Sequence, residues 1–186
     1  MKPFRNGAAA GIYIKKKFLS SVIEQWICVY DNIPRIDFET KIDWKQDHIL
    51  LKALFPVDLH AEKATYDIQF GTVERPTHKN TSWDAAKFEV CAHKYADISE
   101  DGYGVSLLND CKYGYDISGS NMRITLLKSA TYPNPDADKC EHTFVYSVYP
   151  HTGNHKQGKT VQQAFNLNVP MCAVSVSPKE SGLEPS

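Results

Sequence analysis

The chain carries carboxylates that could perform glycoside hydrolysis, the first chemistry that its residue types allow. Such hydrolysis needs two carboxyl groups beside the scissile bond, about 5–5.5 Å apart in retaining enzymes and wider apart in inverting ones. The acidic residues available for such a pair are Asp43, Asp97, Glu100, Asp110, Asp116, Asp136 and Asp138. Most acidic residues on a β-protein are solvated turn residues, so the carboxylates alone assign no catalytic residue.

Two spacings of cysteine and histidine resemble metal-ligand motifs. One residue separates Cys140 from His142, and three residues separate His151 from His155. A zinc site needs three or four converging ligands, normally with paired cysteines or an HExxH signature. The sequence has neither signature, so we expect no metal site within this chain.

A cysteine and a histidine also stand close together on one predicted strand. Cys91 and His93 are two residues apart, and positions two apart on a strand lie on the same face. A thiolate beside an imidazole could act as a nucleophile, although a buried thiol beside a hydrogen-bonded histidine is the commoner arrangement. The chain has no GxSxG, P-loop or GxGxxG motif, and we predict no catalytic residue in it.

Aromatic side chains are the last candidates for ligand contact. The chain has ten tyrosines and three tryptophans, which suit either sugar stacking or the core of a β-sandwich. Trp83 stands between polar residues in a turn-rich segment. It is therefore the aromatic residue predicted to contact a ligand.

The segments that would position these side chains have strand periodicity. In Arg35–Trp44, apolar Ile36, Phe38, Ile42 and Trp44 alternate with charged residues, as in a half-buried antiparallel strand. Further strand patterns occur over residues 18–30, 49–59, 64–73, 87–95, 104–108, 122–127, 143–149 and 160–176. No stretch has a helical stripe of useful length. The sequence predicts an all-β fold, a large antiparallel β-sandwich.

The totals fit one domain of 186 residues. We expect an N-terminal leader over residues 1–14, a β-sandwich over residues 15–176 that is cut at both ends, and a flexible tail over residues 177–186. A net charge of −1 gives no electrostatic argument for nucleic acid, and no apolar run reaches the ~20 residues that span a bilayer. We therefore expect neither nucleic acid nor a membrane as a partner.

The cysteines indicate the compartment. Five widely spaced cysteines without a CxxC pair argue against a disulfide framework. They are Cys28, Cys91, Cys111, Cys140 and Cys172. Because the N-terminus also lacks an apolar signal region, we expect a reducing, cytoplasmic location.

Six segments resemble the C-terminal β-domains of glycoside hydrolase family 38 α-mannosidases, especially the bacterial and cytosolic branch. They are RIDFETKIDW (35–44), LLKALFPVDL (50–59), FGTVERPTHKNTSWDAAKFEVCAHKYADISE (70–100), GYGVSLLNDCKYGYD (102–116), LLKSATYPNPDAD (126–138) and EHTFVYSVYPH (141–151). The similarity covers roughly residues 15–176 in order. It implies a supersandwich of the galactose-mutarotase type.

The resemblance also implies a function. The parent enzyme would be a retaining, exo-acting α-mannosidase that removes terminal mannose from oligosaccharides. Its nucleophilic aspartate and zinc would lie in an N-terminal catalytic domain, the partner of this domain and outside these residues. The loop after Leu127 would reach the rim of the sugar site through Lys128, Asp136 and Asp138. Many relatives carry arginine where this chain has Lys128, and lysine offers a point charge in place of a fork.

Two functions of other classes stay open. An autonomous carbohydrate-binding module would use Trp83 and the tyrosines. A mutarotase-like epimerase would use His93 or His142 with a carboxylate as acid and base. The fold allows all three functions and decides between none of them.

Overall fold

The computed structural model describes residues 1–169 and 171–175, and strands make up most of them. The elements are β1 (Lys2–Asn6), β2 (Ala9–Phe18), β3 (Ser21–Tyr30), β4 (Ile33–Asp43), β5 (Leu51–Pro56), β6 (Lys63–Ile68), β7 (Gly71–Pro76), α1 (Ser82–Ala85), β8 (Val90–Cys91), β9 (Tyr95–Glu100), β10 (Tyr103–Asn109), β11 (Gly114–Ser118), β12 (Asn121–Leu127), β13 (Glu141–His151) and α2 (Thr160–Asn168). Neither helix is long and apolar enough to cross a bilayer.

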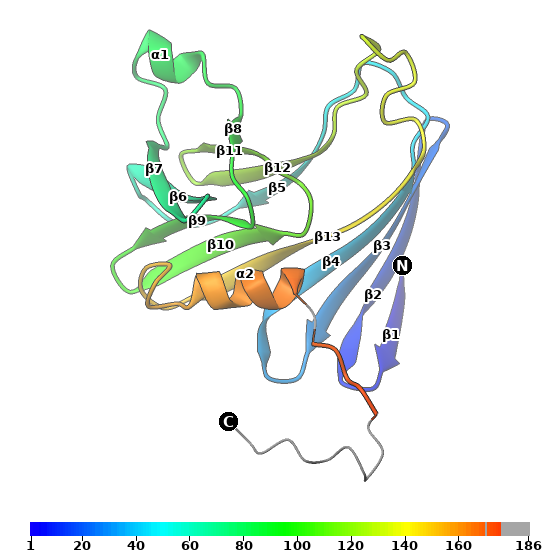
Figure 1. Ribbon diagram of the computed structural model, residues 1–186, viewed down its shortest axis with the longest axis horizontal. Coiled ribbons are helices and arrows are strands. Elements are labelled where there is room, and N and C mark those ends of the chain that lie inside the picture. Colours follow the sequence, from blue (N-terminus) through cyan, green and yellow to red (C-terminus); the bar gives the residue numbers. More distant parts are fainter. Residues whose placement is uncertain (170, 176–186) are drawn as a thin grey trace.

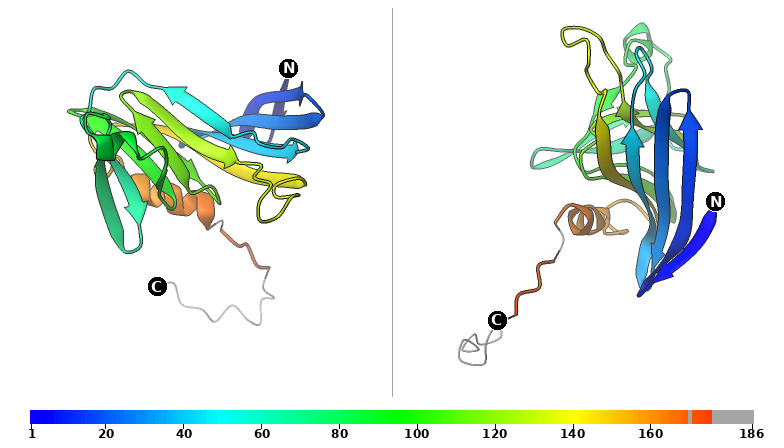
Figure 2. Two further views of the ribbon diagram at one scale, coloured as in Figure 1. Left: turned by 90° about the horizontal axis from the view of Figure 1, so that it is seen from above. Right: turned by 90° about the vertical axis from the view of Figure 1, so that its right-hand side faces the viewer.

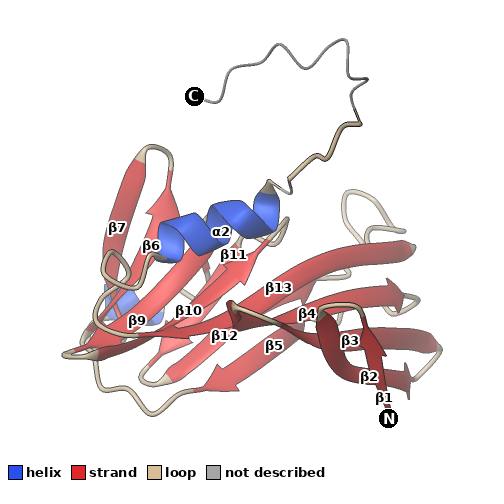
Figure 3. Ribbon diagram, turned by 90° about the horizontal axis from the view of Figure 1, so that it is seen from below, coloured by secondary structure: helices blue, strands red, loops and turns tan. Residues whose placement is uncertain are grey.

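The strands form two sheets that pack face to face (Figures 1 and 3). The larger sheet has nine strands in the order β1-β2-β3-β4-β13-β10-β9-β6-β7, and the smaller has four in the order β5-β12-β11-β8. The pairs of neighbouring strands are antiparallel, for example β3 with β4 and β10 with β13. The predicted all-β antiparallel sandwich is confirmed.

One apolar core lies between the two sheets. Ile98, Leu107 and Phe144 reach it from the larger sheet, and Met122 and Ile124 reach it from the smaller one. All five side chains are essentially unexposed. Burying each such side chain contributes roughly 1.5–3 kcal/mol, which explains why alternating strands of this composition close into a sandwich.

The C-terminal segment departs from the prediction. Residues 160–176 were expected to form a strand, but residues 160–168 form helix α2. Ala164 and Leu167 are three positions apart, so they share one helical face. They pack on Tyr95, Leu108 and Tyr149, on the outer face of the larger sheet. The apolar stripe is little more than one turn long, too short to stand out from the polar residues around it.

The N-terminal boundary also departs from the prediction. Residues 1–14 were set apart as a leader, yet residues 2–6 form β1 and residues 9–14 belong to β2 of the larger sheet. Strand β2 pairs with β3 along its whole length. Gly11 allows this close pairing, since a Cβ there would lie 2.1 Å from the carbonyl oxygen of Ile27. The tail expected over residues 177–186 lies outside the described residues.

A buried polar network fixes α2 to the larger sheet. Asp97 is fully buried and accepts hydrogen bonds from Ser99 (2.7 Å), Ser106 (2.6 Å) and Nε2 of His151 (2.7 Å). The Ser106 hydroxyl also meets the hydroxyl of Thr160, the first residue of α2, at 2.7 Å. One carboxylate therefore joins β9, β10, β13 and α2.

Candidate functional site

The loop between β12 and β13, residues 128–140 (the rim loop), is closed by one of the predicted site residues. Oδ2 of Asp138 accepts hydrogen bonds from the backbone amides of Lys128 (3.1 Å) and Ser129 (2.9 Å). The Ser129 amide, and then that of Lys128, holds the pKa of the Asp138 carboxyl below its ordinary value. This carboxylate therefore joins the two ends of the rim loop.

The core of the sandwich holds the same end of the loop. Trp44 is buried, its indole N–H donates to the hydroxyl of Ser129, and its backbone amide donates to the carbonyl of Cys140 (3.1 Å). The amide of His48 donates to the carbonyl of Ser129 (2.9 Å). The segment after β4 therefore contacts both ends of the rim loop and fixes its direction.

Charged groups gather on the outer side of the loop. Nζ of Lys139 lies 2.7 Å from Asp47 and 3.5 Å from Asp136, and the hydrogen bond with Asp47 raises the pKa of Lys139. Nε2 of His142 lies 2.8 Å from the carbonyl oxygen of Asp138. The loop thus presents hydrogen-bonding groups of both charges, a composition that can recognise sugar hydroxyls.

The structure brings together three of the four predicted site residues. Lys128 and Asp136 are exposed on the rim loop, and Asp138 closes it. Trp83 is 82% exposed on α1. Helix α1 and the rim loop stand at opposite ends of the sandwich (Figures 1 and 2). Trp83 therefore cannot contact the same sugar ring as Lys128.

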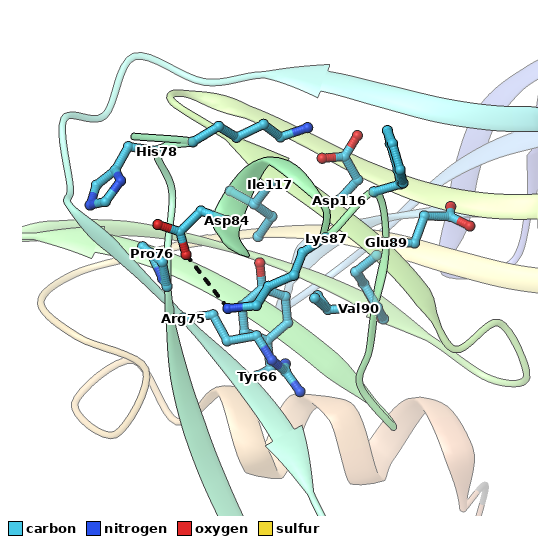
Figure 4. A pocket seen from close by; sticks show the side chains of 13 residues that line it. Tyr66, Arg75, Pro76, His78, Asp84, Lys87, Glu89, Val90, Asp116 and Ile117 are labelled. Atoms are coloured by element: carbon cyan, nitrogen blue, oxygen red, sulfur yellow. Dashed lines mark ion pairs between the residues drawn. The ribbon is translucent and has the colours of Figure 1, made fainter. Parts of the chain in front are cut away.

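The hollow beside α1 is lined by side chains that join the α1 segment to the sandwich (Figure 4). Its volume is about 30 Å³, room for roughly one water molecule. Two of its charged side chains contact neighbours: Lys87 lies 3.5 Å from Asp84, and the guanidinium of Arg75 lies over the ring of Tyr66 at 4.6 Å, although Nη1 of Arg75 has no hydrogen-bond partner among the described residues. We infer that these contacts hold the α1 segment to the sandwich and that the hollow is too small for a sugar.

The cysteine and histidine candidates are not arranged as predicted. The strand expected over residues 87–95 is short, and β8 contains only Val90–Cys91. Cys91 is exposed, so the expectation of a buried thiol is wrong. Sγ of Cys140 lies 3.5 Å from Nε2 of His142. Within residues 1–169 and 171–175, no group of three His, Cys, Asp or Glu side chains could hold a metal ion.

A fold of two antiparallel sheets with an anchored, polar rim loop can be compared with known proteins. The glycosyl hydrolases family 38 C-terminal domain matches residues 4–136. The chain belongs to this family. The match includes residues 4–6 of β1 and residues 128–136 of the rim loop, so it begins before the boundary predicted at residue 15.

Curated relatives are α-mannosidases. The chain is 46% identical over 146 residues to alpha-mannosidase G of Dictyostelium discoideum, covering 78% of this chain and 13% of that protein. It is 42% identical over 155 residues to alpha-mannosidase 2C1 of Homo sapiens (83% and 15%), and 44% over 152 residues to an alpha-mannosidase of Saccharomyces cerevisiae (81% and 14%). The chain thus spans about one seventh of each relative.

A solved structure agrees on the fold. The crystal structure of an alpha-mannosidase from Enterococcus faecalis V583 superposes with a TM-score of 0.74 at 20% identity, covering 81% of this chain and 18% of that one. At this identity the likeness concerns the fold alone. The resemblance to family 38 C-terminal domains is confirmed by the family match and by the relatives.

Replacing Asp138 with alanine should loosen the rim loop and leave the sandwich folded. Two charge-assisted hydrogen bonds are lost from a partly exposed site, so we expect a cost of about 1 kcal/mol. The pKa of Asp138 is lowered on folding, so its contribution is complete above the unfolded value near 3.8 and disappears as pH falls through the lower folded value.

Amide hydrogen exchange of Lys128 and Ser129 measures this loosening. Their protection, expressed relative to the intrinsic exchange rates, should fall in the Asp138→Ala variant at neutral pH, and in the unmodified chain as the pH falls through the lowered pKa of Asp138. Asp136→Ala is the matched control, since the Asp136 carboxylate accepts no hydrogen bond from a backbone amide among the described residues. Equal acceleration in both variants would contradict the closing role of Asp138.

Proposed function

We propose that this chain is the non-catalytic C-terminal β-sandwich of a longer retaining α-mannosidase, which hydrolyses terminal α-mannosyl residues of oligosaccharides. The anchored rim loop, in a chain of this family, is the observation that carries the proposal. The sandwich supports the catalytic domain, and the loop contributes Lys128 and Asp136 to the rim of the sugar site. Asp138 acts there by closing the loop.

The chemistry of hydrolysis belongs to another part of the enzyme in this proposal. No carboxylate pair of the hydrolytic kind is found at the rim loop, where Asp138 is bonded to backbone amides and Asp136 to Lys139. The described residues also do not fit a zinc site. In this proposal the zinc ion and the nucleophile belong to the catalytic domain. The widely spaced cysteines, which argue for a reducing compartment, support a cytoplasmic location for the enzyme.

An uncovered part of the larger sheet supports the presence of a neighbouring domain. The β3–β4 and β2–β3 registers place Ile12 and Ile27 beside Phe38 on one face, since cross-strand partners share a face. Phe38 packs on Phe55 of the smaller sheet, with ring centroids 5.3 Å apart. Ile12, 37% exposed, continues the same face past the smaller sheet.

A groove marks the place where the smaller sheet ends. Its volume is about 260 Å³, and Ile14, Ile23 and Leu51 are among its lining residues. Strand β5 forms the adjacent edge of the smaller sheet, so its outer backbone groups are available for pairing. We propose that the catalytic domain, or a segment that joins the two domains, covers this groove.

A chimera tests the proposal. The matching 152 residues of the yeast relative are replaced by this chain, and hydrolysis of p-nitrophenyl α-mannoside is measured with added zinc. We expect the chimera to be active and the isolated chain to show no turnover. Turnover by the isolated chain, or an unfolded chimera, would contradict the supporting role.

Within an active chimera, Lys128→Ala should raise KM about five- to tenfold, because a charge-assisted contact with the sugar is worth roughly 1–1.5 kcal/mol. Lys79→Ala is the matched control, since Lys79 is an exposed lysine near α1, at the other end of the sandwich. An unchanged KM in the Lys128 variant would remove this residue from the rim.

Neither of the two other functions is supported in the form that was predicted. A binding module on Trp83 and the tyrosines would rest on a single aromatic residue of a four-residue helix, since no described aromatic contact joins a tyrosine to Trp83. An epimerase needs a histidine beside a carboxylate, but His142 is bonded to a backbone carbonyl, and no carboxylate lines the hollow that contains His93. The α-mannosidase domain remains the function that we propose.

A further inference from the structure

A second hollow, of about 260 Å³, lies on the side of the molecule that carries α2. It is lined by Cys91, His93, Lys94, Tyr113 and Asn168. These residues come from the end of β8 and its connection to β9, from the turn after β10, and from the last turn of α2. No residue of the rim loop lines it, so the proposed function makes no use of this hollow.

One buried residue, through its side chain and its backbone carbonyl, organises all three walls of the hollow. Asn109 is fully buried, and its Nδ2 donates to the carbonyl of His93 at 2.7 Å. Its Oδ1 accepts from the amide of Lys112 at 2.7 Å, next to Tyr113. Its backbone carbonyl accepts from Nδ2 of Asn168 at 2.8 Å. The walls are therefore fixed relative to one another before any ligand arrives, as preorganised binding requires.

A second set of bonds holds the residues on either side of His93. The carbonyl of Asp67 accepts from the amide of His93 (2.9 Å), and its Oδ2 accepts from the amide of Lys94 (2.9 Å). The amide of Ala92 donates to the carbonyl of Tyr113 (3.0 Å). The segment between β8 and β9 is irregular, but the backbone amides of its three residues, 92–94, all donate hydrogen bonds that fix its conformation.

The side chains in the hollow offer an aromatic surface and polar groups beside it. Tyr113 is 52% exposed and meets the ring of His93 edge-on, with centroids 6.1 Å apart. The ammonium of Lys94 is held 4.7 Å from the ring centre of Phe165. Nδ2 of Asn168 donates hydrogen bonds to two backbone carbonyls. Its Oδ1 can therefore accept a hydrogen bond from a ligand.

A pyranose matches this combination. It has an apolar C–H face that stacks on an aromatic ring, and hydroxyls around its edge that both donate and accept. Pockets for drug-sized ligands span roughly 300–1,000 Å³, so a hollow of about 260 Å³ is suited to a single ring. The lining itself contains no carboxylate, but the carboxylate of Asp67 lies 4.0 Å from Nζ of Lys94, so a neutral sugar fits better than one with an acidic substituent.

We propose that this hollow is a carbohydrate-binding site for one pyranose ring. Tyr113 stacks on the face of the sugar, and Lys94, His93 and the amide oxygen of Asn168 bind its hydroxyls. The site lies apart from the rim loop, so it holds a glycan at a place other than the one where a mannosyl residue would be cleaved.

The exposed cysteines provide a test with the unmodified chain. Cys91 lines the hollow, whereas Cys140 ends the rim loop, and both are exposed. Alkylation by iodoacetamide is followed at each cysteine by peptide mass spectrometry, with and without methyl α-mannopyranoside. We expect the sugar to slow alkylation of Cys91 about fivefold at four times its Kd, and to leave Cys140 unchanged. Sorbitol, an open-chain polyol, should protect neither cysteine.

Two matched variants complete the test. Tyr113→Ala removes the stacking ring and should raise the Kd of the sugar about tenfold, so that protection of Cys91 at the same sugar concentration falls from about fivefold to about 1.4-fold. Tyr132→Ala removes an 88% exposed tyrosine from the rim loop and should leave that protection unchanged. Each variant is compared with itself, with and without sugar, so altered thiol reactivity does not enter the result.

The outcomes separate this inference from the proposed function. No protection of Cys91, or full protection in the Tyr113→Ala variant, overturns the site. Protection of Cys140 alone supports the rim loop and likewise overturns the site. Protection of Cys91 together with an inactive chimera supports the site and contradicts the role proposed for the rim loop.

Discussion

Replacing Asp97 with alanine is expected to lower the free energy of unfolding by about 3–5 kcal/mol, because it removes the buried carboxylate and leaves its hydrogen-bond donors without an acceptor. Ser106 and His151, which are both buried, would lose their shared acceptor, and half-buried Ser99 would lose the same partner. Nδ1 of His151 is already buried without a hydrogen-bond partner among the described residues. The loss would therefore leave this imidazole with no partner at either nitrogen.

The packing around His151 prevents the network from rearranging. A Cβ at Gly104 would lie 2.4 Å from Cε1 of His151, and a Cβ at Gly158 would lie 2.4 Å from its Cγ. With both glycines in contact with the ring, the imidazole has no room to turn toward a new acceptor. The cost of an unpaired buried group should therefore appear in full.

Urea unfolding measures this cost, and three variants isolate its cause. Asp97→Asn keeps the shape but loses the charge and part of the accepting capacity, so it should fall between the unmodified chain and Asp97→Ala. Asp101→Ala changes an exposed aspartate in the turn before β10 and should have an effect within about 0.5 kcal/mol. A small effect of Asp97→Ala would show that the network does not hold α2.

Hydrogen exchange of residues 160–168 gives a second measurement. The hydroxyl of Thr160 is joined to Asp97 only through Ser106, so the start of α2 should lose protection in Ser106→Ala before the strands do. Protection that is lost equally in α2 and in β9 would mean that helix and sheet unfold as one unit.

The sandwich itself could be predicted from the sequence because its strands alternate. In β4 and the residue after it, Ile42 and Trp44 are buried as the predicted alternation requires. At the start of the strand the alternation is wrong: Ile36 is 37% exposed, whereas Arg35 and Asp37 are buried as an ion pair, because α2 covers that face and Arg35 bonds to Gln163. The number of strands in each sheet and their order could not be predicted in this way. Strand order depends on which strands meet across long connections, such as β4 with β13, and periodicity carries no information on partners.

The two ends of the described chain were missed for different physical reasons. Strand β2 is rich in small and basic residues, and its pairing with β3 depends on the backbone and on Gly11. Helix α2 is short, and its stability comes from packing on the sheet, as is usual for short helices. Neither cause leaves a strong pattern in the local sequence.

The site was predicted in part. The rim loop and its residues follow from the family resemblance, and three of the four predicted residues lie on it. The binding of the Asp138 carboxylate to two backbone amides is a tertiary detail that no spacing predicts. The sequence also gave no reason to combine His93, Tyr113 and Asn168, since they meet only because Asn109 bonds to each of the three segments.

Replacing Trp44 with alanine is the second large effect that we expect, about 3–5 kcal/mol, as for other buried tryptophans. The indole is 1% exposed and stacks on Phe18 with ring centroids 5.9 Å apart. Its N–H donates to the hydroxyl of Ser129, a fully buried residue at the start of the rim loop. One side chain thus contributes to the core and directs the loop.

Trp44→Phe separates these two contributions. Phenylalanine keeps much of the apolar contact with Phe18, but it leaves the Ser129 hydroxyl without its donor, at a cost of about 1–3 kcal/mol. Trp26→Phe is the matched control, because Trp26 packs on Tyr13 in the N-terminal strands, away from the rim loop.

Exchange of the loop amides and the KM of the chimera then decide the role of Trp44. If the indole directs the rim loop, Trp44→Phe should accelerate exchange at Ser129 and raise KM, whereas Trp26→Phe should change only stability. If KM rises in both variants in proportion to their loss of stability, the core affects the sugar site only by keeping the domain folded. A KM that rises with Trp44→Phe alone would mean that the sandwich sets the geometry of the sugar site through this one hydrogen bond.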